Sequence, residues 1–315
     1  TTLLPFTTRF RSKDLVPPIE EFPKNPFEKM DKLPNFLIYW FIKKNIKKLR
    51  DGMGGKSKDF TTRKIVITDK KIMGYQEEIK IRIYKPETDE NRPLVMFYHG
   101  GGFFGGSLGA VDEFCKAVSD HGNSVVVSVE YHLAPEYKYP VGIEDSYEAI
   151  KWCRKNVTEL NIDLDRISVA GDSAGANFSA VLALMANDRK EFTIHKQILL
   201  YPLVDSSQYK GSKGGMNIAM LKLYMKKLTM TKHPYISPLL YEDHKGLPDA
   251  LIACGEYDFL YENSEQYATV LSDADVSVKH ITYKNAFHAF IDNTGNDKNA
   301  NDLVLEVSNF INEKE

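Results

Sequence analysis

A serine between a β-type run and a helical stretch is the residue best placed to do chemistry in this sequence. Ser173 stands in the pentapeptide GDSAG (171–175), which fits the pattern G-x-S-x-G. The pentapeptide follows the run RISVA (166–170) and opens the helical stretch SAGANFSAVLALMA. A sharp strand-to-helix turn lifts such a serine hydroxyl clear of the sheet. We therefore predict that Ser173 is a nucleophile, with a turn that merely caps the helix as the alternative.

A serine hydroxyl needs a neighbouring base to attack, and two histidines late in the chain could supply one. In the chain order that this setting favours, the histidine comes after both the serine and an acid. His280 lies inside the β-type run VSVKHITY (276–283), whereas His288 lies in the loop NAFHAF that follows this run. Such a loop reaches the carboxyl edge of the sheet, where Ser173 is expected. We predict that His288 is the base and that the other histidines, His99 included, are structural or lie on the surface.

A carboxylate has to hold that imidazole in one tautomer and stabilise the imidazolium that forms. The loop after the run DALIACG (249–255) reads EYDFLYE. Asp258 lies three residues beyond the end of this run, and we predict that it is the acid. Glu256 and Glu262 are the competitors, each with the alternative of a solvated carboxylate or one that favours a helix N-terminus.

Three consecutive glycines follow His99 directly after the β-type run PLVMFY (93–98). Glycine lets the backbone approach a ligand closely and turn its N–H groups inward. Such donors stabilise the negative oxygen of a tetrahedral intermediate. We predict that the donors of this oxyanion hole are the amides of Gly101, Gly102 and Ala174. A phosphate-binding glycine loop is the alternative, but neither Lys-Ser/Thr nor G-x-G-x-x-G spacing accompanies these glycines.

Eight β-type runs alternate with helical stretches and define the elements that must position these residues. This alternation predicts one α/β domain over 1–315, built on a mostly parallel eight-stranded sheet with helices on both faces. The first two runs alternate in polarity and are expected to pair antiparallel. Helices are expected at 35–50, 110–121, 140–156, 174–188, 261–274 and 299–313. The runs span residues 62–69, 77–86, 93–99, 123–131, 166–171, 195–202, 249–255 and 276–283.

Residues 205–236 interrupt this alternation with a glycine-rich stretch and an amphipathic helix. An insertion after the sixth strand would lie above the carboxyl ends of the strands. We expect it to form a helical cap together with about residues 1–50, of which 1–34 read as irregular segments with short helices. An ordinary surface helix and an amphipathic membrane anchor are the alternatives for the inserted helix.

The substrate pocket is expected to be apolar, with aromatic and methionine side chains beside the glycine loop and in the cap. Plain core or cap packing is the alternative for each of them. The candidate pocket residues are Phe103, Phe104, Trp40, Phe41, Met216 and Met220.

The composition of the 315-residue chain excludes several classes of function. Forty-one basic and 43 acidic residues give a net charge of −2, which predicts no affinity for nucleic acid. The longest apolar run, residues 36–42, is far short of the ~20 residues that span a bilayer, and no secretory signal is visible. Cys115, Cys153 and Cys254 are widely spaced in apolar stretches. They are expected to be buried free thiols rather than disulfides or zinc ligands, which favours a cytoplasmic location.

Taken together, the motifs resemble the hormone-sensitive-lipase-like branch of the α/β-hydrolase esterases. The resemblance covers roughly residues 62–315 and rests on HGGGF (99–103), YHLAPE (131–136), GDSAGAN (171–177), YDFL (257–260) and FHAF (287–290). It implies the same triad and oxyanion assignments, a helical cap, and carboxylesterase activity without a cofactor or metal. Two positions depart from the family pattern: Phe259 stands where proline is usual, and His132 stands where arginine is usual.

The function expected from these residues is that of a serine carboxylesterase. It would hydrolyse short to medium acyl esters or aryl esters, all small molecules, through an acyl-enzyme. An amidase or deacetylase of the arylacetamide type is the first alternative, because the same triad serves both leaving groups. A non-catalytic small-molecule receptor and a protein-interaction module on the same fold are the others. The sequence leaves the oligomeric state open, a homodimer included.

Overall fold

The computed structural model describes residues 7–11, 33–87, 90–209 and 215–313. Within them a nine-stranded sheet runs in the order β1-β9-β8-β7-β6-β4-β5-β3-β2. All neighbouring strands are parallel except β2 with β3 and β3 with β5, so β3 alone runs against the others. The strands are β1 (Thr7–Arg11), β2 (Ile65–Met73), β3 (Glu78–Pro86), β4 (Arg92–Tyr98), β5 (Val125–Glu130), β6 (Ile162–Asp172), β7 (Lys196–Leu200), β8 (Asp249–Gly255) and β9 (Val278–Tyr283).

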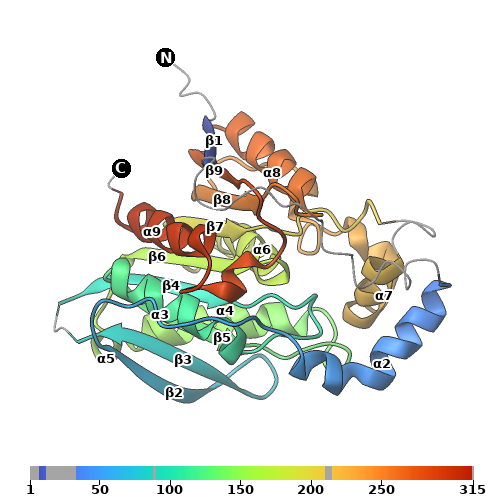
Figure 1. Cartoon of the computed structure of the whole chain (residues 1–315), viewed down its shortest axis with the longest axis horizontal. Coiled ribbons are helices and arrows are strands. Elements are labelled where there is room, and N and C mark those ends of the chain that lie inside the picture. The colour runs from blue at the N-terminus through green and yellow to red at the C-terminus, as the bar shows by residue number, and fades with distance from the viewer. Residues whose placement is uncertain (1–6, 12–32, 88–89, 210–214, 314–315) are drawn as a thin grey trace.

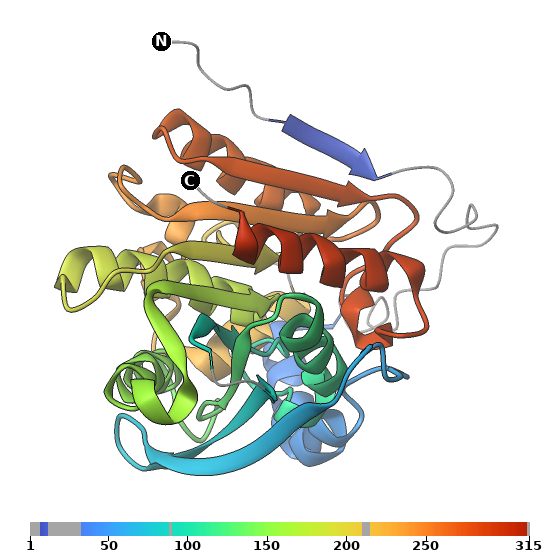
Figure 2. The ribbon, with the colours of Figure 1, turned by 90° about the vertical axis from the view of Figure 1, so that its left-hand side faces the viewer.

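The central strands are apolar along their whole length because helices cover both faces of the sheet. Nearly every residue of β4, β5, β7 and β8 is buried, whereas most of the edge strand β2 is exposed. Figure 1 and Figure 2 show the helices in two layers around the twisted sheet. The helices are α2 (Asn35–Asp51), α3 (Asp112–His121), α4 (Val141–Lys155), α5 (Val157–Leu160), α6 (Ala174–Arg189), α7 (Gly215–Tyr224), α8 (Tyr261–Asp273) and α9 (Lys298–Asn312).

The core lies in two layers, one on each side of the sheet. Helices α3 and α9 pack against one face. Helices α4, α6 and α8 pack against the other face. Helix α6 is buried continuously from Ala174 to Ala186, as expected for a helix that is apolar all round. Ser173 is therefore attached to the most deeply buried helix of the molecule, which fixes its position.

The eight strands predicted from the sequence all form, and β1 adds a ninth at the edge of the sheet. β1 lies parallel to β9 and comes from the stretch that was expected to be irregular. That expectation was wrong for residues 7–11, because TTRFR has one apolar residue in five and gives no periodic signal. Pairing of its backbone with the open edge of β9 makes the strand. Residues 1–6 and 12–32, also expected to be irregular, lie outside the described residues.

Helices α2 and α7 pack against each other at one end of the molecule, as Figure 1 shows. Both were predicted, α2 near the N-terminus and α7 inside the insertion after the sixth predicted strand. Ile38 and Ile42 on the inner side of α2 are fully buried and join the same apolar cluster as Leu221 and Tyr224. The two segments expected to form a cap are thus in direct contact.

Candidate active site

The turn that carries Ser173 is held in a conformation that side chains rarely adopt. Ser173 has φ 54° and ψ −112°, between the end of β6 and the start of α6. A Cβ at position 175 would lie 1.8 Å from the carbonyl oxygen of Tyr98, and one at 171 would lie 2.5 Å from it. Glycine is therefore required at both positions. Strain of this kind persists only where the surroundings over-determine it, and here it presents the serine hydroxyl at the carboxyl edge of the sheet.

Asn177 fastens this turn to neighbouring segments. Its Nδ2 donates to the carbonyl of Leu203 at 2.6 Å and to that of Ile236 at 2.9 Å. Its own amide donates to the carbonyl of Ser173 at 3.0 Å. The sequence analysis assigned Asn177 no role, although the motif GDSAGAN contains it. Its spacing of four residues from Ser173, one helical turn, is the signal that could have found it.

The structure brings Ser173, His288 and Asp258 together from three distant parts of the chain. Nε2 of His288 lies 2.9 Å from Oγ of Ser173. Nδ1 of His288 lies 2.9 Å from each carboxylate oxygen of Asp258. In the tautomer with hydrogen on Nδ1, the imidazole donates to the carboxylate and accepts the serine proton at Nε2. This arrangement can move a proton away from the serine hydroxyl.

Asp258 is buried and is positioned by its own loop. The amide of Leu260 donates to Oδ1 of Asp258 at 2.7 Å, and the amide of Tyr261 donates to its carbonyl at 3.0 Å. The competing acids lie elsewhere: Glu262 is exposed, and Glu256 accepts from the amide of Asn285.

His280, the competing base, lies within β9 and away from the triad. It is fully buried, with Nε2 at 3.6 Å from Sγ of Cys254. Burial lowers the pKa of His280 to about 4, so this imidazole stays neutral near neutral pH. All three cysteines, Cys254 among them, are free and buried, which confirms the prediction of buried thiols.

The glycine loop after β4 adopts a backbone that only glycine takes readily. Gly101 has φ 120° and Gly102 has φ 61°. The amides of Phe104 and Gly105 both donate to the carbonyl of Gly101, which folds the loop on itself. Within the described residues the amides of Gly101 and Gly102 have no acceptor. Ala174 is the first residue of α6, so its amide has no partner inside the helix. Among the described residues, no backbone acceptor is occupied by any of these three amides.

His99 braces the start of this loop. Its ring stacks on that of Tyr131 with centroids 4.4 Å apart, and its Nδ1 lies 2.8 Å from the carbonyl of Gly100. Burial lowers the pKa of His99 to about 4. The Tyr131 hydroxyl donates to the His99 carbonyl at 2.6 Å. A neutral, buried imidazole in these contacts fits the structural role expected for it.

Two further acids interact electrostatically with His288, and neither was predicted from the sequence. Asp172 is buried, and its Oδ1 accepts from the amide of Gly100 at 2.7 Å, which ties the serine turn to the glycine loop. Burial, and then the charge of Asp292, raise the pKa of Asp172 to about 7. Burial raises the pKa of Asp292 to about 6. Only the position of Asp172 next to Ser173 could have drawn attention to it in the sequence.

Two of the six candidate pocket residues are exposed on α2. Trp40 is 60% exposed and Phe41 is 45% exposed, because Ile38 and Ile42 occupy the inner side of α2. The expectation that Trp40 and Phe41 line a pocket is therefore not supported by where they lie. Met216 is the second residue of α7, and its side chain lies outside the described residues.

The other three candidates lie on the glycine loop or against it. Phe103 is buried and stacks on Tyr224 of α7, with centroids 4.0 Å apart. Phe104 is buried, and its carbonyl accepts from Nε of Arg50 in α2 at 2.7 Å. A Cβ at Gly102 would lie 2.8 Å from Sδ of Met220, so this methionine of α7 touches the loop. Both helices expected in the cap thus contact the glycine loop.

His132 and Phe259, the two residues that depart from the family pattern, each contact another side chain. Nδ1 of His132 lies 2.7 Å from Oδ2 of the buried Asp145, so His132 makes a hydrogen bond to a carboxylate in the place of the usual arginine. Phe259, in the place of the usual proline, has its ring centroid 4.3 Å from that of His288.

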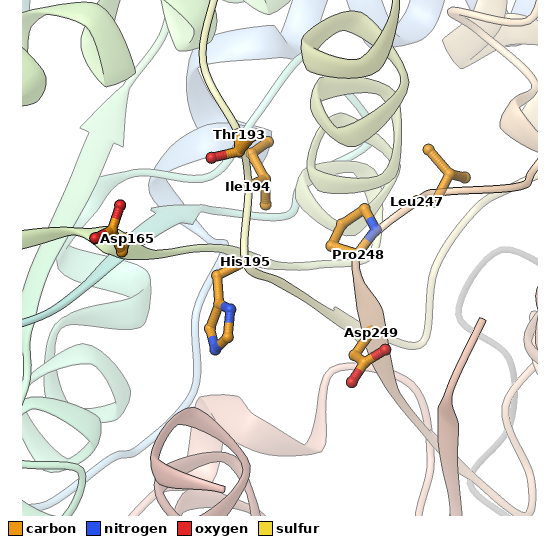
Figure 3. A pocket seen from close by; sticks show the side chains of 7 residues that line it. All are labelled: Asp165, Thr193, Ile194, His195, Leu247, Pro248 and Asp249. Atoms are coloured by element: carbon orange, nitrogen blue, oxygen red, sulfur yellow. The ribbon is translucent and has the colours of Figure 1, made fainter. Parts of the chain in front are cut away.

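Two cavities of the molecule lie away from Ser173. One, of about 320 Å³, lies at the amino ends of β7 and β8, whereas Ser173 follows the carboxyl end of β6. Figure 3 shows its lining, which is Asp165, Thr193, Ile194, His195, Leu247, Pro248 and Asp249. The other, of about 310 Å³, lies between the loop after α2 and residues 107–110. Neither contains a member of the triad.

Within the part of the chain that the structure describes, no group of three or more His, Cys, Asp or Glu side chains is arranged to hold a metal ion. Over the same residues, no helix combines the length and the apolar character needed to cross a membrane.

The chain is similar to a known protein family, to named relatives and to solved structures. Residues 95–292 match the family model described as alpha/beta hydrolase fold. An arylesterase of Saccharolobus solfataricus is 36% identical over 71% of this chain and 76% of its own length. The carboxylesterase NlhH of Mycobacterium tuberculosis is 35% identical over 71% of this chain and 75% of its own. The solved structure of a hyperthermophilic esterase from Pyrobaculum calidifontis is similar with a TM-score of 0.76 and 31% identity, covering 89% of this chain and 91% of that one.

The chain therefore belongs to the α/β-hydrolase family, in its hormone-sensitive-lipase-like branch. Within that family it is a carboxylic ester hydrolase.

Proposed function

We propose that this enzyme is a serine carboxylesterase that hydrolyses short to medium acyl esters or aryl esters through an acyl-enzyme. The observation that carries the proposal is the continuous relay from Oγ of Ser173 through His288 to Asp258, with each contact at 2.9 Å. Relatives named arylesterase and carboxylesterase support ester over amide substrates.

In the first half of the proposed reaction, Ser173 attacks the ester carbonyl carbon while Nε2 of His288 takes its proton. The buried Asp258 carboxylate stabilises the imidazolium that forms. The carbonyl oxygen becomes negative and accepts hydrogen bonds from the amides of Gly101, Gly102 and Ala174. The C–O bond to the alcohol then breaks, and the alcohol leaves with the proton from Nε2.

In the second half, a water molecule takes the place of the alcohol. His288 removes a proton from this water as its oxygen attacks the acyl carbon. The same three amides bind the second oxyanion. The bond to Oγ of Ser173 breaks, the serine regains its proton from Nε2, and the carboxylic acid leaves. The balance is one ester and one water giving one acid and one alcohol.

The proposal includes one domain with α2 and α7 as its cap. Its support is the contact of both helices with the glycine loop, through Arg50 and Met220. A small-molecule ester would then bind between these helices and the carboxyl ends of the strands. The three buried free thiols support a reducing, cytoplasmic location.

The proposal is tested by covalent labelling with a fluorophosphonate, which adds to an activated serine oxygen with loss of fluoride. We expect one adduct per chain, mapped by mass spectrometry to Ser173. Ser173→Ala should abolish labelling, while the exposed Ser277→Ala serves as the matched control and should label at the wild-type rate. Labelling of another residue, or none on folded protein, would refute the assignment.

A further inference from the structure

An exposed aromatic ring lies directly against the base of the proposed relay. Phe259 is 64% exposed, although burial of a phenylalanine side chain is favourable. Its ring centroid is 4.3 Å from that of His288, with 40° between the ring planes. The same imidazole also packs against the buried ring of Tyr201, with the ring centroids 4.8 Å apart. Phe259 thus forms a solvent-facing apolar surface beside the imidazole.

Hydrogen bonds hold the backbone on either side of Phe259, and this fixes the position from which its ring extends. The neighbouring Asp258 donates its amide to the carbonyl of Gly255 and accepts from the amides of Leu260 and Tyr261. Close by in sequence, Tyr257 is 37% exposed and packs against Phe287 at 5.5 Å between centroids. The loops that carry the acid and the base therefore both expose aromatic surface.

The proton transfer from His288 indicates which part of the ester, the acyl group or the alcohol, would lie beside Phe259. Nε2 of His288 has to hand its proton to the oxygen of the leaving alcohol, so the alcohol lies beside the imidazole. The acyl oxygen lies instead at the amides of the glycine loop, where Met220 is in contact. A ring against His288 is within reach of the first carbons of the alcohol.

We propose that Phe259 is a specificity-determining residue that binds the apolar, ring-bearing alcohol portion of the substrate ester. This inference rests on the proposed esterase function and extends it to the leaving group. Offset or edge-to-face contact between two aromatic rings gives an attraction beyond simple burial. Esters of arylmethyl alcohols are therefore preferred over esters of short alkyl alcohols, independently of the acyl chain.

The test compares benzyl acetate with ethyl acetate, which share an acyl group and have alcohols of similar acidity. We expect Phe259→Ala to lower the ratio of their kcat/KM values about 5–10-fold, the size of one aromatic contact. Phe259→Tyr should keep the wild-type ratio. A series from ethyl acetate to ethyl hexanoate should keep its chain-length profile in Phe259→Ala. Tyr75→Ala, an exposed aromatic in the turn between β2 and β3, is the control for loss of a surface ring.

Each outcome separates this inference from the function on which it rests. If Phe259→Ala lowers kcat/KM by the same factor for both acetates, the ring acts only on His288 and the inference is wrong. An unchanged ratio together with unchanged rates also overturns it, and thermal melting checks that the variant is folded. If the wild-type protein hydrolyses no ester of either series, the proposed function itself fails and the inference falls with it.

Discussion

At the scale of single residues, the site holds two buried carboxyl groups in different surroundings, Asp258 and Asp172. Asp258 is buried and accepts hydrogen bonds from the amide of Leu260 and from His288. Asp172 is equally buried, accepts from the amide of Gly100, and has the charge of Asp292 nearby. Two carboxyl groups close to one imidazole are thus suited to different tasks, one to orient His288 and one to join two loops.

The raised pKa of Asp172 predicts a pH-dependent stability. The pKa rises from 3.8 to about 7 in the fold, so the folded state holds a proton that the unfolded chain releases between these values. The contribution of this group to the free energy of unfolding is therefore complete below about pH 4, and it is lost as the pH rises through about 7. Asp172→Asn keeps an acceptor for the Gly100 amide and cannot titrate.

Urea unfolding of both proteins at pH 4.5 and pH 8 measures this effect. We compare the free energy of unfolding of Asp172→Asn with that of wild type at each pH. This difference should favour the variant more at pH 8 than at pH 4.5, by about 1–4 kcal/mol for a shift of about three pKa units. The neutral His99 is present in both proteins, so its own acid-side loss of stability cancels in the difference. If the variant and wild type differ in free energy of unfolding by the same amount at both pH values, Asp172 is charged in the folded protein and the prediction is wrong.

At the scale of elements, the site depends on the connection between α6 and the segments above it. The side-chain amide of Asn177 in α6 binds carbonyls on both sides of the insertion, Leu203 and Ile236. Arg50 of α2 binds the carbonyls of Phe104 and Ala134 and the carboxylate of Glu136, so α2 is attached to the glycine loop. These bonds join α2 and the 205–236 segment to the glycine loop and to the helix that follows Ser173.

We predict that Asn177→Ala destabilises the fold and lowers activity together. The substitution leaves two carbonyls without their donor, which costs about 1–3 kcal/mol for each buried group left unpaired. Urea unfolding should show this loss, and kcat should fall because Ser173 is one helical turn away. Asn187→Ala, near the exposed end of the same helix, is the control and should change neither quantity appreciably. Full stability of Asn177→Ala would show that these bonds do not hold the insertion.

The elements that were predicted correctly are those whose pattern repeats along the chain. Strands β4 to β9 read as short apolar runs because they are covered on both faces, and α6 follows its glycine motif directly. β1 could not be predicted, because its pairing with β9 depends on backbone contacts rather than on its own side chains. The orientation of α2 also escaped prediction, since Trp40 and Ile38 lie on opposite sides of a helix that is apolar on both.

At the scale of the whole molecule, the relay is assembled from residues 115 positions apart in the chain. That Ser173, Asp258 and His288 lie together could be predicted from the sequence because each follows the carboxyl end of a recognisable strand. Parallel strands bring those ends to a common edge, so chain order was enough. Asp292 could not be found in this way, because its effect on Asp172 depends on tertiary packing alone.

If Ser173 is the nucleophile and His288 its base, the two residues act as one unit, and a double-mutant cycle measures this coupling. The measurement is kcat/KM for p-nitrophenyl butyrate in Ser173→Ala, His288→Ala and the double variant. Each single substitution should reduce it by about 10⁴-fold or more, and the double variant should be no worse than either, because a relay that has lost one member has lost both. Losses that multiply in the double variant, or a single variant with near-wild-type activity, would contradict the account.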